Sequence, residues 1–178
     1  MQRQLLSLLT VAVLWGTWCA CESNNNTPSY SCSGYTMHLS FQDSSGINLN
    51  VTNNTLFRTT TDTGSYKHLA TEALVDSFKL IINLLDGPYH GDALWDDSLP
   101  IKVYNYSKTI PGVNYGLILA GTRDGAGVKY FETDTSCVVL TKWDPRKQTM
   151  TGSYYFEANN HTVKGAGTFT NVCFVSLK

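Results

Sequence analysis

A chain of 178 residues is the size of one domain built around one hydrophobic core. Charged residues make up only 15% of it, against about 25% in average proteins, and an apolar share of 42% argues against disorder. The net charge is -1 with no basic cluster, so we expect no nucleic-acid partner.

The first twenty residues are predicted to be a signal peptide. Arg3 supplies a positive charge near the amino terminus, and residues 5–18 then form an uncharged, mainly apolar run. This run is shorter than the about 20 residues that a helix needs to cross a bilayer. We therefore expect residues 1–20 to direct export and to be removed, and we expect no spanning helix in the mature protein.

A lipid anchor is expected directly after this segment. Ala20 precedes Cys21, and residues 22–28 form a polar string that suits a flexible tether. The arrangement resembles the start of bacterial lipoproteins, in which the Cys after a small residue becomes the lipidated first residue. The resemblance implies a membrane anchor at Cys21, a tether over residues 21–33 and an envelope location, expected to be the outer membrane. Ordinary cleavage near Ala20 is the alternative.

Three cysteines remain after Cys21, an odd number for an oxidising compartment. They are Cys32, Cys137 and Cys173, so at most one disulfide can form among them. Cys137 and Cys173 lie in strand-like runs, where we expect at least one of them to be a small buried hydrophobic residue. The sequence leaves the pairing open.

The rest of the chain, residues 34–178, is predicted to be a single β domain. Residues 35–41 alternate strictly between apolar and polar side chains, which is typical of a half-buried strand. A turn at residues 43–46 follows, and the alternation resumes at Ile47, Leu49 and Val51, which predicts a hairpin.

The segment 66–85 fits two patterns. Its first part, 67–75, is predicted to be a helical turn or a strand, and 77–85 to be a strand that ends at Asp86, Gly87 and Pro88. Further strands with turn residues between them are expected at 101–106, 115–120, 128–133, 136–142, 150–158 and from 162 onward. This spacing is typical of an antiparallel β-sandwich or a partly open barrel, with at most one short helix.

The last third gives the clearest local prediction. Residues 150–158 alternate, a turn follows at 159–161, and residues 162–165 and 167–170 complete a meander whose glycines mark a bulge or a close approach of backbones. The stretch 151–160, followed by Gly167, Thr168 and Phe169, resembles the closing meander of small Bacteroidota lipoproteins of unknown function. Residues 78–85 and the following 87–89 are similar to the central strand of that family. The resemblance implies an anchored β domain and assigns no catalytic residue.

Candidate catalytic carboxylates are confined to one loosely spaced group, Asp86, Asp92, Asp96 and Asp97. Two carboxylates can hydrolyse a glycoside when they lie about 5 to 10 Å apart. Gly and Pro residues around these acids indicate a solvated loop instead, where Asp is a common turn residue. The pattern of a calcium-binding loop is absent, and we expect no metal and no cofactor.

Exposed aromatic side chains are the better indication of a binding site. Tyr155 falls on the polar face of its strand, Trp95 lies in the acidic loop and Trp143 precedes a turn. Flat rings on a β surface can stack on sugars or on partner side chains, although they also cover their neighbours in ordinary strands.

The sequence therefore predicts a non-catalytic envelope lipoprotein that functions in binding or assembly, with a glycan or a protein as its partner. The first alternative is a glycan-binding module that uses Trp95, Trp143 and Tyr155. The second is a small hydrolase that uses Asp92, Asp96 or Asp97.

Overall fold

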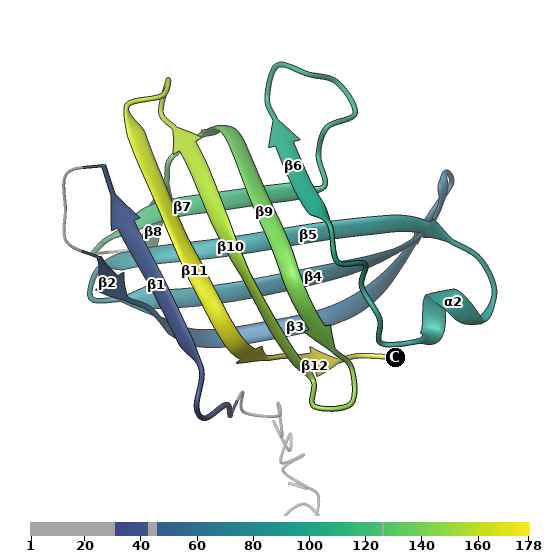
Figure 1. The fold of residues 1–178 in the computed structure, drawn as a ribbon. Coiled ribbons are helices and arrows are strands. Elements are labelled where there is room, and N and C mark those ends of the chain that lie inside the picture. Colours follow the sequence, from purple (N-terminus) through teal and green to yellow (C-terminus); the bar gives the residue numbers. More distant parts are fainter. Residues whose placement is uncertain (1–30, 43–45, 126) are drawn as a thin grey trace, which may run out of the picture.

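The computed structural model describes residues 31–42, 46–125 and 127–178, which fold into two β-sheets and one short helix (Figure 1). The prediction of an all-β, sandwich-like fold is thereby confirmed. None of the described residues belongs to a helix that is long and apolar enough to cross a membrane. The expected signal peptide, residues 1–20, and Cys21 lie outside the described residues.

Each sheet has six strands, and all neighbours are antiparallel except β12 and β3. Across the first sheet, sheet A, the order is β2 (Ile47–Asn48), β1 (Thr36–Phe41), β11 (Val163–Cys173), β10 (Thr149–Ala158), β9 (Thr133–Asp144) and β6 (Val103–Ser107). Across the second, sheet B, it is β12 (Val175–Ser176), β3 (Asn50–Thr61), β4 (Gly64–Val75), β5 (Phe78–Tyr89), β7 (Gly116–Asp124) and β8 (Gly127–Tyr130). The helix α2 (Asp92–Trp95) separates β5 from β6 in the sequence.

The strands of sheet A cross those of sheet B at a steep angle, so the two sheets form two layers (Figure 1). Along each long strand, alternate side chains point between the layers and are buried. The strict alternation of residues 35–41 and 150–158 is confirmed in this way, with Met37, Leu39, Tyr154 and Phe156 inside. The opposite set of each strand faces outward, which leaves two broad outer surfaces.

The predicted C-terminal meander of residues 150–158, 162–165 and 167–170 is wrong in its strand count, because its last two strands are one: the segment forms the hairpin of β10 and β11. Residues 163–173 form one continuous strand, because the two glycines inside it admit close neighbours rather than end it. A Cβ on Gly165 would lie 2.6 Å from the ring of Phe156, and one on Gly167 would collide with the backbone carbonyl of His38. The prediction of a close backbone approach is confirmed at Gly167, whereas the close neighbour of Gly165 is a side-chain ring.

The predicted N-terminal hairpin is confirmed only in part. Leu39 pairs with Ile47 across it, but the pairing stops at Asn48. From Asn50 onward the chain enters sheet B as β3, where Val51 pairs with Ala73 of β4. One alternating run of residues therefore contributes to both sheets, a change of direction that the hydrophobic pattern does not encode.

The ambiguous segment is two long strands joined by a two-residue turn at Asp76 and Ser77. The alternative of a helical turn at 67–75 is excluded, since those residues lie in β4. The predicted end of the second strand at Asp86 was wrong, because β5 continues to Tyr89. Asp86 stays on the inner face of β5 and is only 4% exposed, whereas a solvated loop residue was expected.

A disulfide joins Cys32, just before β1, to Cys173 at the end of β11. The bond ties the two ends of the described chain together and closes a loop with a sequence separation of 141 residues. Next to it, the buried amide of Asn54 donates to the carbonyl oxygen of Cys173 at 2.8 Å, which attaches this end of sheet A to β3. Cys137 is outside any disulfide and is half-buried on β9.

Candidate functional site

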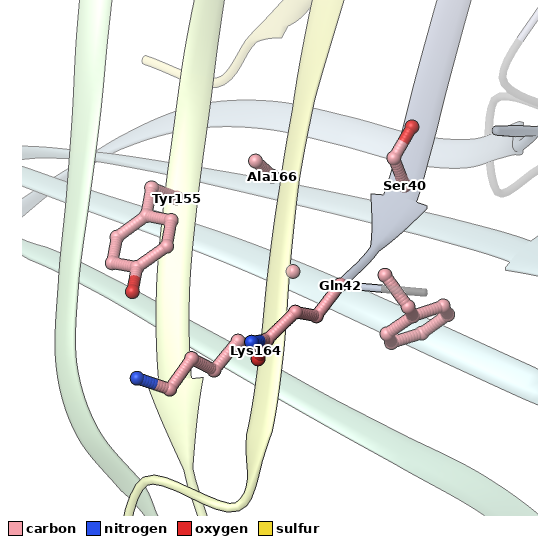
Figure 2. Close-up of a pocket in the computed structure, with 7 residues that line it drawn as sticks. Ser40, Gln42, Tyr155, Lys164 and Ala166 are labelled. Carbon is pink, nitrogen blue, oxygen red and sulfur yellow. The ribbon is translucent and has the colours of Figure 1, made fainter. Parts of the chain in front are cut away.

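A shallow hollow of about 350 Å³ lies on the outer face of sheet A, and it contains one of the predicted aromatic residues. Figure 2 shows Tyr155 on β10 at one side, Ser40 on β1 and Gln42 just after β1 at the other, and Ala166 between them on β11. We refer to it as the Tyr155 hollow. Its lining residues are Ser40, Phe41, Gln42, Tyr155, Lys164, Gly165 and Ala166.

The pairing of three strands creates this hollow. Ala166 lies directly opposite Tyr155 on one side and Ser40 on the other, so the three outward side chains form one row. The two outer strands of the row are about 10 Å apart, twice the usual strand spacing. Ala166, in the middle of the row, carries only a methyl group, so the surface is recessed at that position. Beside it stands Tyr155, which is 39% exposed.

A polar network holds the Tyr155 ring in place. Its hydroxyl donates a short hydrogen bond to Glu157, the next outward residue on β10. Lys164, which is opposite Glu157 on β11, donates to the same carboxylate at 3.1 Å. The ring of His161, in the turn between the two strands, contacts the other oxygen of Glu157. One carboxylate therefore orients an aromatic, a cation and a turn residue.

These contacts also fix the protonation of the site. Hydrogen bonds from Tyr155, Lys164 and His161 lower the pKa of Glu157 to about 2. The bond to that carboxylate, with burial, raises the pKa of Tyr155 to about 12. At neutral pH the carboxylate is thus charged and the phenol neutral. A glycosidase needs a carboxyl group that stays protonated near neutral pH as its general acid, and Glu157 cannot supply that proton.

The three predicted aromatic residues do not share one surface. Tyr155 pairs with Cys137 of β9, and Trp143 lies six residues further along that strand. Trp143 is therefore about 20 Å from the position opposite Tyr155. Its ring stacks on Phe174 at 4.2 Å, and its Nε1 donates to the carbonyl oxygen of Asp97 at 2.7 Å. Trp95 is 54% exposed at the end of α2. Trp143 is thus used in packing, and only Tyr155 borders the hollow.

The acidic segment forms a strap across one end of the sandwich, which we define as residues 92–99. Arg58 of β3 donates to the carboxylate of Asp97 and to the carbonyl oxygen of Asp96, each at 2.8 Å. Lys67, which is fully buried on β4, donates to the Asp96 carboxylate at 2.5 Å and to the carbonyl oxygen of Ser98 at 2.9 Å. Leu94 and Leu99 point inward beneath the strap and are buried.

Two carboxylates of the strap, those of Asp96 and Asp97, are therefore matched by cations. Burial would raise the pKa of Asp96, but hydrogen bonds from Lys67 and Ser98 outweigh it and lower that pKa to about 2. The pKa of Asp97 is also lowered, since hydrogen bonds from Ser176 and Arg58 outweigh its burial. Charged carboxylates bound to cations attach the strap to the sandwich; they do not form the pair of unlike carboxyls that glycoside hydrolysis uses.

Asp86 belongs to a second charged group beneath the strap. Its carboxylate accepts short hydrogen bonds from the hydroxyl of Tyr89 and the ammonium of Lys102. That ammonium also lies 4.9 Å from the centre of the buried Tyr104 ring. Across the described ranges, no three His, Cys, Asp or Glu side chains are grouped so that they could hold a metal ion.

Sequence reasoning identified Tyr155 but missed its partners. The signal for Glu157 and Lys164 was present, because the predicted turn at 159–161 places residues near its two ends opposite each other. The contribution of β1 had no such signal. Ser40 and Gln42 reach the site only because β1 pairs with β11, more than one hundred residues later in the chain.

Comparisons with known proteins give no match. The chain matches no protein-family model, no curated protein and no solved structure.

Proposed function

We propose that this chain is an exported envelope lipoprotein whose β domain is a non-catalytic module that binds a neutral glycan in the Tyr155 hollow. The observation that carries the proposal is the row of Tyr155, Ala166 and Ser40, which places an exposed ring beside a low floor. The apolar face of a sugar ring can stack on the tyrosine there, while hydroxyl and amide groups around it bind the sugar hydroxyls.

The polar groups of the hollow suit an uncharged ligand. The ammonium of Lys164 is already paired with Glu157, so neither charge needs a partner from the ligand. Gln42 and Ser40 offer a neutral amide and a hydroxyl on the opposite side. An open, shallow site of this kind would bind part of a long chain rather than enclose a small molecule.

Two observations support binding without cleavage. The pKa of Glu157 is lowered to about 2, so the carboxyl group that bonds Tyr155 is deprotonated at physiological pH values. Among the acids that sequence reasoning considered for hydrolysis, Asp96 and Asp97 bind Lys67 and Arg58 in the strap, and Asp86 binds Lys102. An arrangement that holds a ligand therefore accounts for the site better than a hydrolase does.

Export is supported by the apolar run at residues 5–18 and by the disulfide between Cys32 and Cys173, because such bonds persist in oxidising compartments. A lipid at Cys21 would put the membrane on the side of Cys32. The strand β1 then leads away from it for about 17 Å, from Thr36 to Phe41, to the end of sheet A that carries the hollow (Figure 1). The hollow thus lies at the end of β1 that is away from the expected tether.

The glycan proposal is tested by electrophoresis of the full chain through native gels that contain neutral polysaccharides, such as glucans, mannans and xylans. We expect at least one of them to retard the protein, and Tyr155→Ala to abolish the retardation. Tyr130→Ala is the matched control, because Tyr130 has the same exposed fraction, 39%, on β8 of sheet B. Retardation that survives Tyr155→Ala, or is lost equally in both variants, would contradict the proposal.

The anchor is tested separately by expressing the full chain in a bacterium fed a labelled fatty acid. The label should appear on the protein and be lost in Cys21→Ala, while Cys137→Ala keeps it. A protein that is exported without label would remove the anchor and leave the glycan proposal standing.

A further inference from the structure

A second pocket, of about 320 Å³, lies on the outer face of sheet B. Three neighbouring strands supply its base, and the connection from β6 to β7 supplies a wall. We refer to it as the His68 pocket. Its lining residues are His68 of β4, Asn83 and Leu85 of β5, Leu117 of β7, Tyr106 of β6 and Asn114.

The pairing of the strands brings these groups together. Leu85 lies opposite His68, and Leu117 lies opposite Asn83, so two adjacent rows each contribute one polar and one apolar side chain. Tyr106 and Asn114 are joined by an isolated antiparallel bridge, which closes the pocket at the edge of the sheet. Residues spread over almost fifty positions of the sequence therefore converge on one volume.

The imidazole of His68 packs against a second ring. Its ring lies 4.5 Å from that of Phe57, and Asn83 lines the same pocket beside it. Burial lowers the pKa of His68 below its usual 6.5, although the side chain of Asn83 opposes this, so the ring is neutral at pH values near and above 7. The six residues that line the pocket include no Asp, Glu, Lys or Arg, so none of its groups is charged there.

This chemistry specifies a kind of ligand. Two leucines offer an apolar surface, and two carboxamides, an imidazole and a phenol offer donors and acceptors without charge. A carboxamide presents a donor beside an acceptor, so its best complement is another donor–acceptor edge. A volume near the lower end of known ligand sites holds one small ring system.

We propose that the His68 pocket binds a small, flat, uncharged heterocycle that carries an amide-like edge, with its ring against Leu85 and Leu117 and its edge on Asn83 and Asn114. This site is independent of the glycan proposal, because it lies on the outer face of the other sheet and shares no residue with the Tyr155 hollow.

The test uses nicotinamide as the probe and nicotinate as its charged counterpart. Each is titrated into the labelled full chain at about pH 7 and up to about 10 mM, above the millimolar Kd that a fragment of one ring can reach. We expect saturable amide and imidazole NMR shifts at His68, Asn83 and Leu117 with nicotinamide. Nicotinate should bind at least about tenfold more weakly, because its carboxylate has no cation to pair with in the pocket.

Variants locate the binding. Asn83→Ala and Asn114→Ala should each weaken nicotinamide binding about fivefold or more, by removing one hydrogen bond. Asn114 is exposed, so its variant keeps the test decisive if Asn83→Ala does not fold. Asn105→Ala, an exposed asparagine on β6 of sheet A, should leave the affinity unchanged. The proposal is overturned by an absence of saturable shifts, by shifts outside the pocket, or by equal affinity for nicotinate.

Discussion

Lys67 and Asp86 lie directly opposite each other on β4 and β5, both on the inner face of sheet B, and yet each is paired with a different residue. Lys67 binds Asp96 in the strap, and Asp86 binds Lys102 just after it. Lys67 and Asp86 thus each bind a residue of the segment that follows β5. Together they hold that segment across the end of the core. The strap is attached by charge as well as by Leu94 and Leu99.

This arrangement predicts unequal effects for the two partners of one ion pair. Asp96→Asn removes the ion-pair partner of the fully buried Lys67 ammonium, and we expect a loss of about 1–3 kcal/mol in the free energy of unfolding. Lys67→Met should cost less, since the Asp96 carboxylate is 53% exposed and can be hydrated. Urea denaturation measures both.

The control for the strap is Asp92→Asn, an exposed residue at the start of α2, which should change stability by less than about 0.5 kcal/mol. The charged attachment of the strap is not important for stability if Lys67→Met loses more free energy of unfolding than Asp96→Asn. The same conclusion follows if Asp96→Asn, Lys67→Met and Asp92→Asn all have the same free energy of unfolding.

Acid should weaken the same contacts. Some carboxyl groups have a lower pKa in the folded chain than in the unfolded chain. Such a group stabilises the fold fully at pH values above its pKa in the unfolded chain, and this stabilisation is lost as the pH falls toward its pKa in the folded chain. For Asp96 the stabilisation is lost between pH 3.8 and about pH 2, and for Glu157 between pH 4.5 and about pH 2. We expect the free energy of unfolding to fall steadily between about pH 5 and 2.

The measurement is a series of urea denaturation curves across that range, with NMR titration of the two carboxyl groups. Asp96→Asn should flatten the pH dependence relative to the wild type. A side-chain titration of Glu157 or Asp96 near its usual midpoint would show that the hydrogen bonds described here do not form in solution.

The disulfide is expected to be the largest single contribution to stability near the ends of the described chain. Removing a native disulfide typically costs about 2–5 kcal/mol, which for a protein of this size lowers Tm by very roughly 5–15 °C. Cys32→Ser should show this loss in a thermal scan. Cys137→Ser, at the half-buried thiol outside the bond, should lower Tm far less. Similar losses in the two variants would indicate that the Cys32–Cys173 bond does not form.

Gly167 is predicted to be intolerant of any side chain. Gly167→Ala would place a methyl group against the backbone carbonyl of His38 and the ring of Tyr154, and should cost about 2–4 kcal/mol. At Gly127→Ala nothing lies within 4 Å of the added carbon, so stability should stay within about 0.5 kcal/mol. Equal denaturation midpoints for the two variants would contradict the close packing of β1 against β11.

Much of the fold could be predicted from local patterns, because alternation reports which face of a strand is buried. The inward positions of Met37, Tyr154 and Phe156 followed directly from it. The partition of strands between two sheets did not. Asn48 and Asn50 are two residues apart and belong to different sheets, and that choice depends on partners distant in the sequence.

The candidate site was predictable to the same limited extent. The outward position of Tyr155 was a local property of its strand, whereas the hollow beside it depends on Ala166 and on the distant strand β1. Burial of a charged residue was the least predictable feature. Nothing local marks Lys67 as fully buried, because its partner Asp96 lies in a segment that reads as a solvated loop.

The most direct test of the proposed function is an NMR titration of the labelled full chain with cellohexaose, xylohexaose and mannohexaose. The account predicts that at least one of them shifts the amide signals of Tyr155, Ala166 and Ser40, with smaller changes at Lys164, and that Tyr155→Ala removes these shifts. Shifts confined to Trp95 and the strap, or no shifts with any of the three sugars, would contradict the assignment of the Tyr155 hollow as a glycan site.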